Sequence, residues 1–196
     1  MPSVDLFVED QAHEEFVGAI VRRRAKELGK DLKTHFRSAR GGHGRVLDEL
    51  RLYQASVLKQ YLGLVLPDVL VVAIDANCKR FYRARDDILD ALDDKFKPLA
   101  AIACPDPHVE RWFLADPPRF QSVVGATVRP GRRKCEKSRY KTMVAQAVTR
   151  AGHPPTLGGI EFAGEIVEAM DFYSAGRAEP SLKAFLDDLD VRLQAL

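Results

Sequence analysis

Acidic side chains follow two apolar stretches of this chain at the points where the stretches end. Glu9 closes the stretch at 4–9 (VDLFVE), and Asp75 directly follows the stretch at 69–74 (VLVVAI). Asn77, whose side-chain carbonyl oxygen can also bind a cation, comes two residues after Asp75. If both stretches are strands of one parallel sheet, their carboxyl ends share the edge at which such sheets bind ligands. The placement therefore predicts that Glu9 and Asp75 lie close together.

A third acid, Glu110, lies shortly after another apolar stretch at 99–104 (LAAIAC). Carboxylates that are brought together raise one another's pKa unless a cation neutralises them. Hard divalent ions such as Mg²⁺ and Mn²⁺ prefer carboxylate and carbonyl oxygens as ligands. We therefore predict a site for Mg²⁺ or Mn²⁺ whose ligands are drawn from Glu9, Asp75, Asn77 and Glu110.

Each of these acids also has a plainer interpretation when it is taken alone. An acid just past a strand is often only the N-cap of the next helix, and Asp10 or Asp75 could have that role. What favours the metal interpretation is the joint placement of acids at two strand ends, which is an inference about ligand chemistry and not a motif match.

The elements that must position these acids follow from the apolar patterning. Four stretches have the composition of strands: 4–9, 32–37, 69–74 and 99–104. The third is almost wholly aliphatic, which is typical of a central parallel strand buried on both faces. Apolar residues at helical spacing predict helices between them, at 11–29, 45–64 and 79–96. This alternation predicts an α/β fold with a mostly parallel, Rossmann-like sheet flanked by helices.

The second part of the chain has a different pattern. Residues 105–116 (PDPHVERWFLAD) predict a loop running into a helix, which we expect Pro117-Pro118 to stop. Beyond about residue 121 the strand signals end, and helices are expected at 140–151, 160–172 and 181–193. We therefore expect an α/β domain over 1–120 and a helical extension over 121–196 that packs on it.

Basic residues are concentrated in one run and in the larger part of the chain. The formal net charge is +2, and residues 151–196 contribute −5 of it, which leaves +7 for residues 1–150. The run at 129–141 (RPGRRKCEKSRYK) has seven basic residues and one acid. Such a run suits phosphate contacts, although a solvated loop is its commoner role. The candidate nucleic-acid contacts are Arg132, Arg133, Lys134, Lys137, Arg139 and Lys141, and Lys141 is also a candidate catalytic residue.

The remaining composition bears on the compartment of the protein. Its three cysteines, Cys78, Cys104 and Cys135, are widely spaced without a CxxC pair, so we expect neither a disulfide framework nor a zinc site. No apolar run approaches the roughly 20 residues needed to cross a bilayer. The acidic N-terminal segment does not have the pattern of a signal peptide. Together these features predict a cytoplasmic protein without a membrane partner.

Two histidines lie close in sequence to candidate acids. His13 follows Glu9 by four residues, in the first turn of the predicted helix, where a helix-surface histidine is expected more often than a site residue. His108 is too close to Glu110 in sequence for the two to form a zinc pair on one helix face. We expect Trp112 to pack the helical extension onto the sheet.

Four segments of the chain resemble Toprim-type domains. The segment at 7–16 (FVEDQAHEEF) looks like the first Toprim motif, and the segment at 71–77 (VVAIDAN) resembles the second, a strand ending in Asp-x-Asp. The segments at 105–114 (PDPHVERWFL) and 137–141 (KSRYK) are similar to parts of small standalone Toprim-like proteins linked to phage defence, with a catalytic domain like that of OLD-type nucleases. The resemblance spans roughly residues 4–145.

The resemblance implies roles for particular residues. Glu9 would be the general acid or base, and Asp75 the first metal-binding aspartate. Asn77 stands where a second aspartate is usual, and Asp10 stands where glycine is usual. An asparagine contributes no charge, so metal affinity should fall unless a neighbouring acid such as Asp10, Asp106 or Glu110 compensates.

These observations lead to three hypotheses about function. The first is a Mg²⁺- or Mn²⁺-dependent nuclease of Toprim-like type, with DNA expected ahead of RNA as its nucleic acid. By resemblance it would work in antiviral defence, with a separate ATPase as partner, and it could be an oligomer. The second is a catalytically impaired module that binds nucleic acid or a partner protein. The third is an enzyme acting on a small phosphorylated metabolite.

Overall fold

The computed structural model describes residues 1–39, 45–131, 135–136 and 138–196. A parallel sheet lies at its centre, in the strand order β2-β1-β3-β4. The strands are β1 (Ser3–Val8), β2 (Lys33–Ser38), β3 (Val69–Ala73) and β4 (Ala100–Ala103). The predicted α/β class with a parallel sheet and flanking helices is confirmed, and each strand lies where the sequence predicts it to within two residues.

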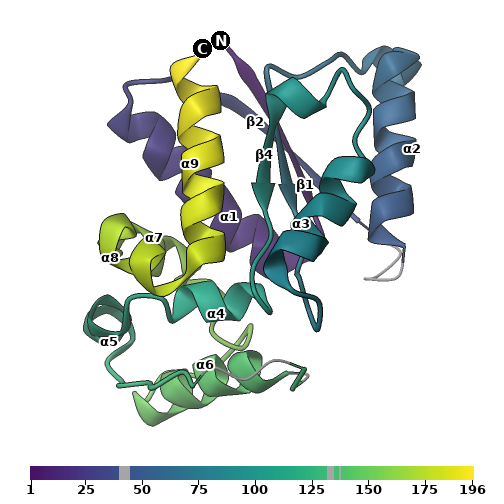
Figure 1. Cartoon of the computed structure of the whole chain (residues 1–196). Coiled ribbons are helices and arrows are strands. Elements are labelled where there is room, and N and C mark those ends of the chain that lie inside the picture. Colours follow the sequence, from purple (N-terminus) through teal and green to yellow (C-terminus); the bar gives the residue numbers. More distant parts are fainter. Residues whose placement is uncertain (40–44, 132–134, 137) are drawn as a thin grey trace.

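Helices cover both faces of the sheet (Figure 1). One face carries α1 (Gln11–Glu27) and α9 (Pro180–Gln194), and the other carries α2 (Val46–Leu58) and α3 (Phe81–Asp90). Alternate residues of β3 divide between the two faces, with Val69 and Val71 in the first core and Leu70 and Val72 in the second. All five residues of β3 are therefore buried, which explains why its sequence is continuously apolar.

Helix α9 packs against β4, which is an edge strand of the sheet. The strand is made of small residues (AAIA), which allow the helix to approach its backbone. Asp188 accepts a hydrogen bond from the backbone N–H of Ile102 at 3.3 Å, and Arg192 donates to the carbonyl of Ala100 at 3.1 Å. These contacts satisfy backbone groups that an edge strand would otherwise expose to other chains.

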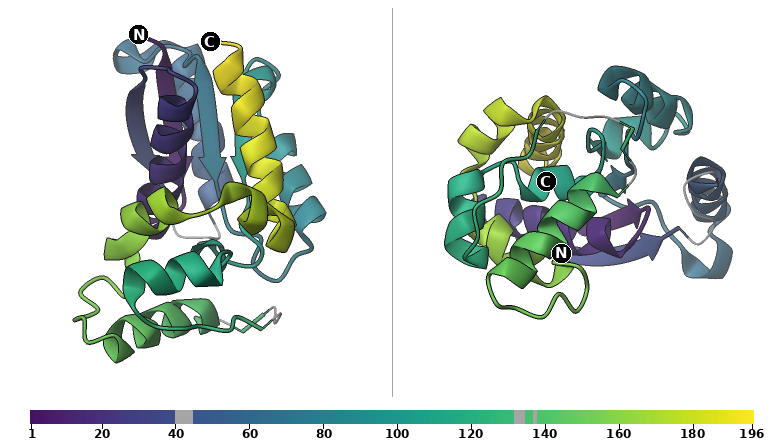
Figure 2. Two further views of the ribbon diagram at one scale, coloured as in Figure 1. Left: turned by 90° about the vertical axis from the view of Figure 1, so that its left-hand side faces the viewer. Right: turned by 90° about the horizontal axis from the view of Figure 1, so that it is seen from below.

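The remaining helices lie beyond the carboxyl ends of the strands (Figure 2). In chain order they are α4 (Val109–Phe113), α5 (Pro117–Val124), α6 (Arg139–Arg150), α7 (Ala163–Ala169) and α8 (Phe172–Ala178). Short 3-10 helices occur at Tyr61–Gly63, Lys97–Leu99 and Ile160–Phe162. Trp112 joins this layer to α9, because its indole N–H donates to Ser181 at 2.9 Å and its ring stacks on Phe185.

The boundary at residue 120 stays a prediction. Helix α5 spans it, and the core on the α1 face includes Val144, Ile166 and Leu189 together with β1 and β3. The helices after residue 121 therefore share one hydrophobic core with the sheet.

Several helical boundaries differ from those expected, and the expected helix at 160–172 is a 3-10 helix followed by α7, which ends at Ala169. Pro117 and Pro118 begin α5 and do not stop a helix, since proline fits the first turn, where its missing N–H has no helical partner. Asp116 caps this helix by accepting from the N–H of Arg119. Helix α2 ends at Leu58, before Gln60 adopts a left-handed backbone with φ of 53°, and α3 covers only the middle of the range 79–96.

No helix within the described residues is both long enough and apolar enough to span a bilayer.

Candidate metal centre

The candidate site lies between the central strands β1 and β3, where the connections that follow the two strands run to opposite sides of the sheet. From β1 the chain crosses to β2 on one side, whereas β3 lies on the other side of β1. Ligands in doubly wound sheets bind in the crevice at such a switch point, beyond the carboxyl ends of the strands. Glu9 directly follows β1, and Asp75 lies two residues beyond β3. The backbone N–H of Glu9 still bonds to the carbonyl of Ala73 at 3.0 Å, which fixes its position.

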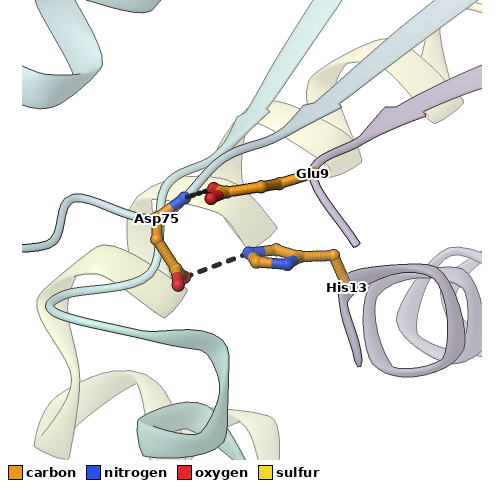
Figure 3. A group of neighbouring side chains, drawn as sticks. All are labelled: Glu9, His13 and Asp75. Carbon is orange, nitrogen blue, oxygen red and sulfur yellow. Dashed lines mark hydrogen bonds and ion pairs between the residues drawn. The ribbon is translucent and has the colours of Figure 1, made fainter. Parts of the chain in front are cut away.

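The side chains of Glu9, His13 and Asp75 converge at this point (Figure 3). Each offers a ligand atom, and the three atoms lie within 4.8 Å of one another. A carboxylate oxygen of Glu9 accepts the backbone N–H of Asp75 at 3.0 Å, and His13 Nε2 lies 3.0 Å from Asp75 Oδ1. The predicted proximity of Glu9 and Asp75 is therefore confirmed, and the three side chains have the geometry to hold a metal ion.

His13 is a site residue, the less common of the two roles expected for a histidine in a first helical turn. Its side chain is fully buried and does not lie on the helix surface. It occupies the third position of α1, after the N-cap Asp10. Asp10 Oδ1 accepts from the backbone N–H of His13 at 3.1 Å and from its ring Nδ1 at 2.8 Å. Asp10 is thus an N-cap, as the plainer interpretation of this acid predicted, and it also turns the imidazole toward Asp75.

Charge compensation explains how these groups coexist. Burial alone would lower the pKa of His13, but Asp75 and Asp10 outweigh it and raise this pKa well above 6.5. Burial alone would raise the pKa of Asp75, but His13 and His108 outweigh it and lower this pKa. Partial burial also opposes the charge of Asp10, yet the hydrogen bonds from His13 lower its pKa to about 2. In the metal-free site, a protonated imidazole therefore supplies the positive charge between the carboxylates.

Two residues from the loop and helix after β4 complete the surroundings. His108 Nδ1 lies 3.0 Å from Asp75 Oδ2, and this hydrogen bond raises the pKa of His108. Burial raises the pKa of Glu110, and the charges of Asp75 and Asp10 add to the effect. Glu110 lies in the first turn of α4, and it is not one of the three residues whose ligand atoms lie within 4.8 Å. His108 was not identified from the sequence, because only the fold brings its loop to Asp75.

Asn77 turns back onto its own loop. Its side-chain amide donates to the carbonyl of Asp75 at 3.2 Å, and its backbone N–H donates to the carbonyl of Pro107 at 2.9 Å. Its φ of 54° is left-handed, a conformation that asparagine tolerates better than most residues. This geometry gives Asn77 a role in shaping the loop after β3.

The predicted nucleic-acid contacts lie on and before α6. Arg132, Arg133, Lys134 and Lys137 fall outside the described residues. Arg139 begins α6 and pairs with Glu136 at 2.6 Å. Lys141 lines a groove of about 720 Å³ on α6, with Arg150 and Gly158 among its other walls. Lys141 belongs to α6, and Figures 1 and 2 both show α4 between this helix and the ends of the strands.

Two contacts anchor the segment before α6, one to α4 and one to the loop after β3. Arg111 donates to the carbonyls of Pro130 and Gly131, at 2.9 and 3.2 Å. Cys78 and Cys135 form a disulfide with their Cα atoms 4.9 Å apart, a pairing that the spacing of the cysteines does not predict. This bond links the loop that carries Asp75 to the basic segment, over a separation of 57 residues.

Comparison of the chain with known protein families, curated proteins and solved structures finds no match.

Proposed function

We propose that this protein is a metal-dependent phosphodiesterase that acts on nucleic acid. The observation that carries the proposal is the convergence of Glu9, His13 and Asp75 at the switch point of the sheet. A bound divalent ion at such a site supplies Lewis acidity toward a phosphate oxygen and lowers the pKa of a coordinated water. Two carboxylates and an imidazole are a suitable ligand set for it.

The residues of this chain have distinct roles in the proposal. Glu9, His13 and Asp75 hold the ion, and Asp10 orients the imidazole through its Nδ1, as carboxylates commonly do for metal-binding histidines. His108, on the opposite oxygen of Asp75, is half-buried and is placed to donate a proton or a hydrogen bond to a phosphate. The role of Glu9 as general acid or base rests on the Toprim resemblance.

The ligand set favours Mn²⁺ over Mg²⁺. Magnesium prefers oxygen ligands and retains its waters, whereas imidazole nitrogen is a common ligand of transition metals. Because His13 lies within the triad, the centre offers an imidazole nitrogen beside its carboxylate oxygens. We therefore expect activity with Mn²⁺ to exceed activity with Mg²⁺.

The basic surface of α6 supports nucleic acid as the substrate class. The described lining of its groove includes Lys141 and Arg150, the hydroxyls of Ser138, Thr142 and Thr149, and no acidic residue. Cations and hydroxyls of this kind bind a phosphate backbone without reading its sequence. Lys141 thus holds nucleic acid in this proposal. A preference for DNA, a place in antiviral defence and a separate ATPase remain proposals from the resemblance alone.

A cleavage assay with Mn²⁺ tests the proposal. Single-stranded and double-stranded DNA and RNA are incubated with wild-type protein, Glu9→Gln, Asp75→Asn and the control Asp86→Asn, which changes an exposed acid of α3. We expect cleavage by the wild type and by the control, and a loss of at least 100-fold in the two triad variants.

Cleavage that is unchanged in Glu9→Gln and Asp75→Asn would refute the proposal. Binding of nucleic acid by the wild type without cleavage in any metal would favour the alternative, a catalytically impaired module that uses the groove on α6.

A further inference from the structure

A cavity of about 330 Å³ lies between α2 and α3 at the carboxyl end of β3. Asp75 belongs to its lining and also to the metal-binding triad, so the cavity opens directly beside the candidate centre. Neither the triad nor the groove on α6 accounts for this space. Its volume is at the lower end of the range for small-molecule sites, which is about 300–1,000 Å³.

The inner wall of the cavity is apolar, and its rim is charged. The deep wall is made of buried aliphatic side chains, namely Val46, Ile74, Ala76, Ala84 and Ile88. At the rim, Asp48 pairs with Arg51 at 2.9 Å, and Lys79 pairs with Asp87 at 2.5 Å. A ligand with apolar faces and hydrogen-bonding edges matches these walls, since the rim offers both donors and acceptors.

We propose that this cavity binds a nucleobase attached to the phosphate at the metal centre. The inference rests on the proposed function and adds the strandedness of the substrate to it. A sugar-phosphate backbone is polar and charged, so it suits the groove on α6 and not an aliphatic wall. A base has flat apolar faces that suit the aliphatic wall, and Asp75 borders both the cavity and the site of the phosphate.

The proposal implies an unpaired substrate. A base inside a duplex is stacked and paired on its edges, so it enters a protein cavity only after it is extruded or when the strand is single. Single-stranded nucleic acid is therefore the substrate class that this cavity selects.

The first test compares two ligands that differ only in the base. Binding of thymidine 5′-monophosphate and of deoxyribose 5-phosphate, each with Mn²⁺, is measured by equilibrium dialysis with wild-type protein, Ala84→Leu and Ala55→Leu. Ala84→Leu narrows the cavity, whereas Ala55 is an exposed residue of α2 and serves as the matched control. We expect wild type and control to bind the nucleotide at least roughly tenfold more tightly, and Ala84→Leu to lose that difference. Equal binding of both ligands by the wild type would overturn the proposal.

The second test needs no variant and so does not depend on whether Ala84→Leu folds. Thymidine 5′-monophosphate is bound to methyl-labelled wild-type protein with Zn²⁺, which is diamagnetic and accepts imidazole and carboxylate ligands, and intermolecular nuclear Overhauser effects are recorded. Contacts between the base protons and the methyl groups of Ile74 or Ile88 are expected, and base contacts confined to other methyl groups would contradict the proposal.

The two proposals can fail separately. Cleavage that depends on the triad but not on the presence of a base would refute the cavity proposal and leave the phosphodiesterase. Base-dependent binding of the mononucleotide without any cleavage would leave the cavity and refute the phosphodiesterase.

Discussion

Metal binding should expel a proton from His13. In the metal-free protein, Nε2 of this ring lies 3.0 Å from Asp75 Oδ1, and Nδ1 lies 2.8 Å from Asp10 Oδ1. Since both partners are carboxylates, both ring nitrogens donate and the imidazole is protonated. A metal ligand must offer a lone pair, so Nε2 gives up its proton to bind the ion, while Nδ1 keeps its hydrogen bond to Asp10.

The size of the effect follows from the loss of one proton. The affinity for the metal then rises about tenfold for each pH unit, or about 1.4 kcal/mol, as long as the pH is below the pKa of His13 in the metal-free protein. Because this pKa is raised well above 6.5, the interval from about pH 5.5 to 6.5 lies within that range. When the metal binds Asp75, His108 no longer lies beside a free carboxylate, so a proton released from His108 adds to the number released by His13.

Isothermal titration calorimetry measures the number of protons released on metal binding directly. Mn²⁺ is titrated at pH 6.5 in two buffers with different enthalpies of ionisation, using wild-type protein and His13→Gln. Glutamine can approach the metal through an oxygen but carries no proton to release. We expect the wild type to release about one proton more than His13→Gln. An equal proton count in the two proteins would refute the protonated state of His13 in the metal-free site.

Three further predictions concern the residues around the centre. Asp10→Ala should weaken Mn²⁺ binding by about 10- to 100-fold in calorimetry, because Asp10 orients the ligand His13. The same substitution should lower the free energy of unfolding by about 1 kcal/mol, because the N-cap of α1 is lost. An unchanged Mn²⁺ affinity would contradict the orienting role of Asp10. In urea unfolding, the raised pKa of His13 should stabilise the metal-free protein below about pH 6.5, and this contribution should be lost as the pH rises through the folded-state pKa. The lowered pKa of Asp75 should give a contribution that is present above pH 3.8 and lost as the pH falls. A free energy of unfolding that keeps rising from pH 6.5 to 9 would contradict the raised pKa of His13. Cys78→Ser should lower the free energy of unfolding of the oxidised protein by about 4 kcal/mol, because the disulfide closes a loop over a separation of 57 residues. It should have little effect in reductant, where the bond to Cys135 is absent. Equal losses of stability in both conditions would refute the cross-link.

The sheet was predictable because its strands have strong local signals. Residues 69–74 are aliphatic on both faces of the strand, and this pattern depends only on burial between two helical layers. The meeting of Glu9 and Asp75 then followed from the parallel arrangement alone. Pro117 shows the limit of such signals, since a proline pair fits the first turn of a helix as well as the end of one.

The two histidines required the tertiary structure. His13 lies three residues after an N-cap aspartate, a spacing typical of an exposed first turn. It is buried because the loop after β3 brings Asp75 over that turn and the loop after β4 brings His108 to the same carboxylate. The pairing of Cys78 with Cys135 likewise depends on how α6 packs beneath α4, which apolar periodicity does not specify.

Anomalous diffraction from crystals soaked in Mn²⁺ tests the central claim most directly. The account predicts a peak at the switch point between β1 and β3, with a carboxylate oxygen of Glu9, Nε2 of His13 and a carboxylate oxygen of Asp75 each about 2.1–2.3 Å from the ion. An ion bound elsewhere, or no peak at this position while Glu9 and Asp75 remain accessible, would contradict it.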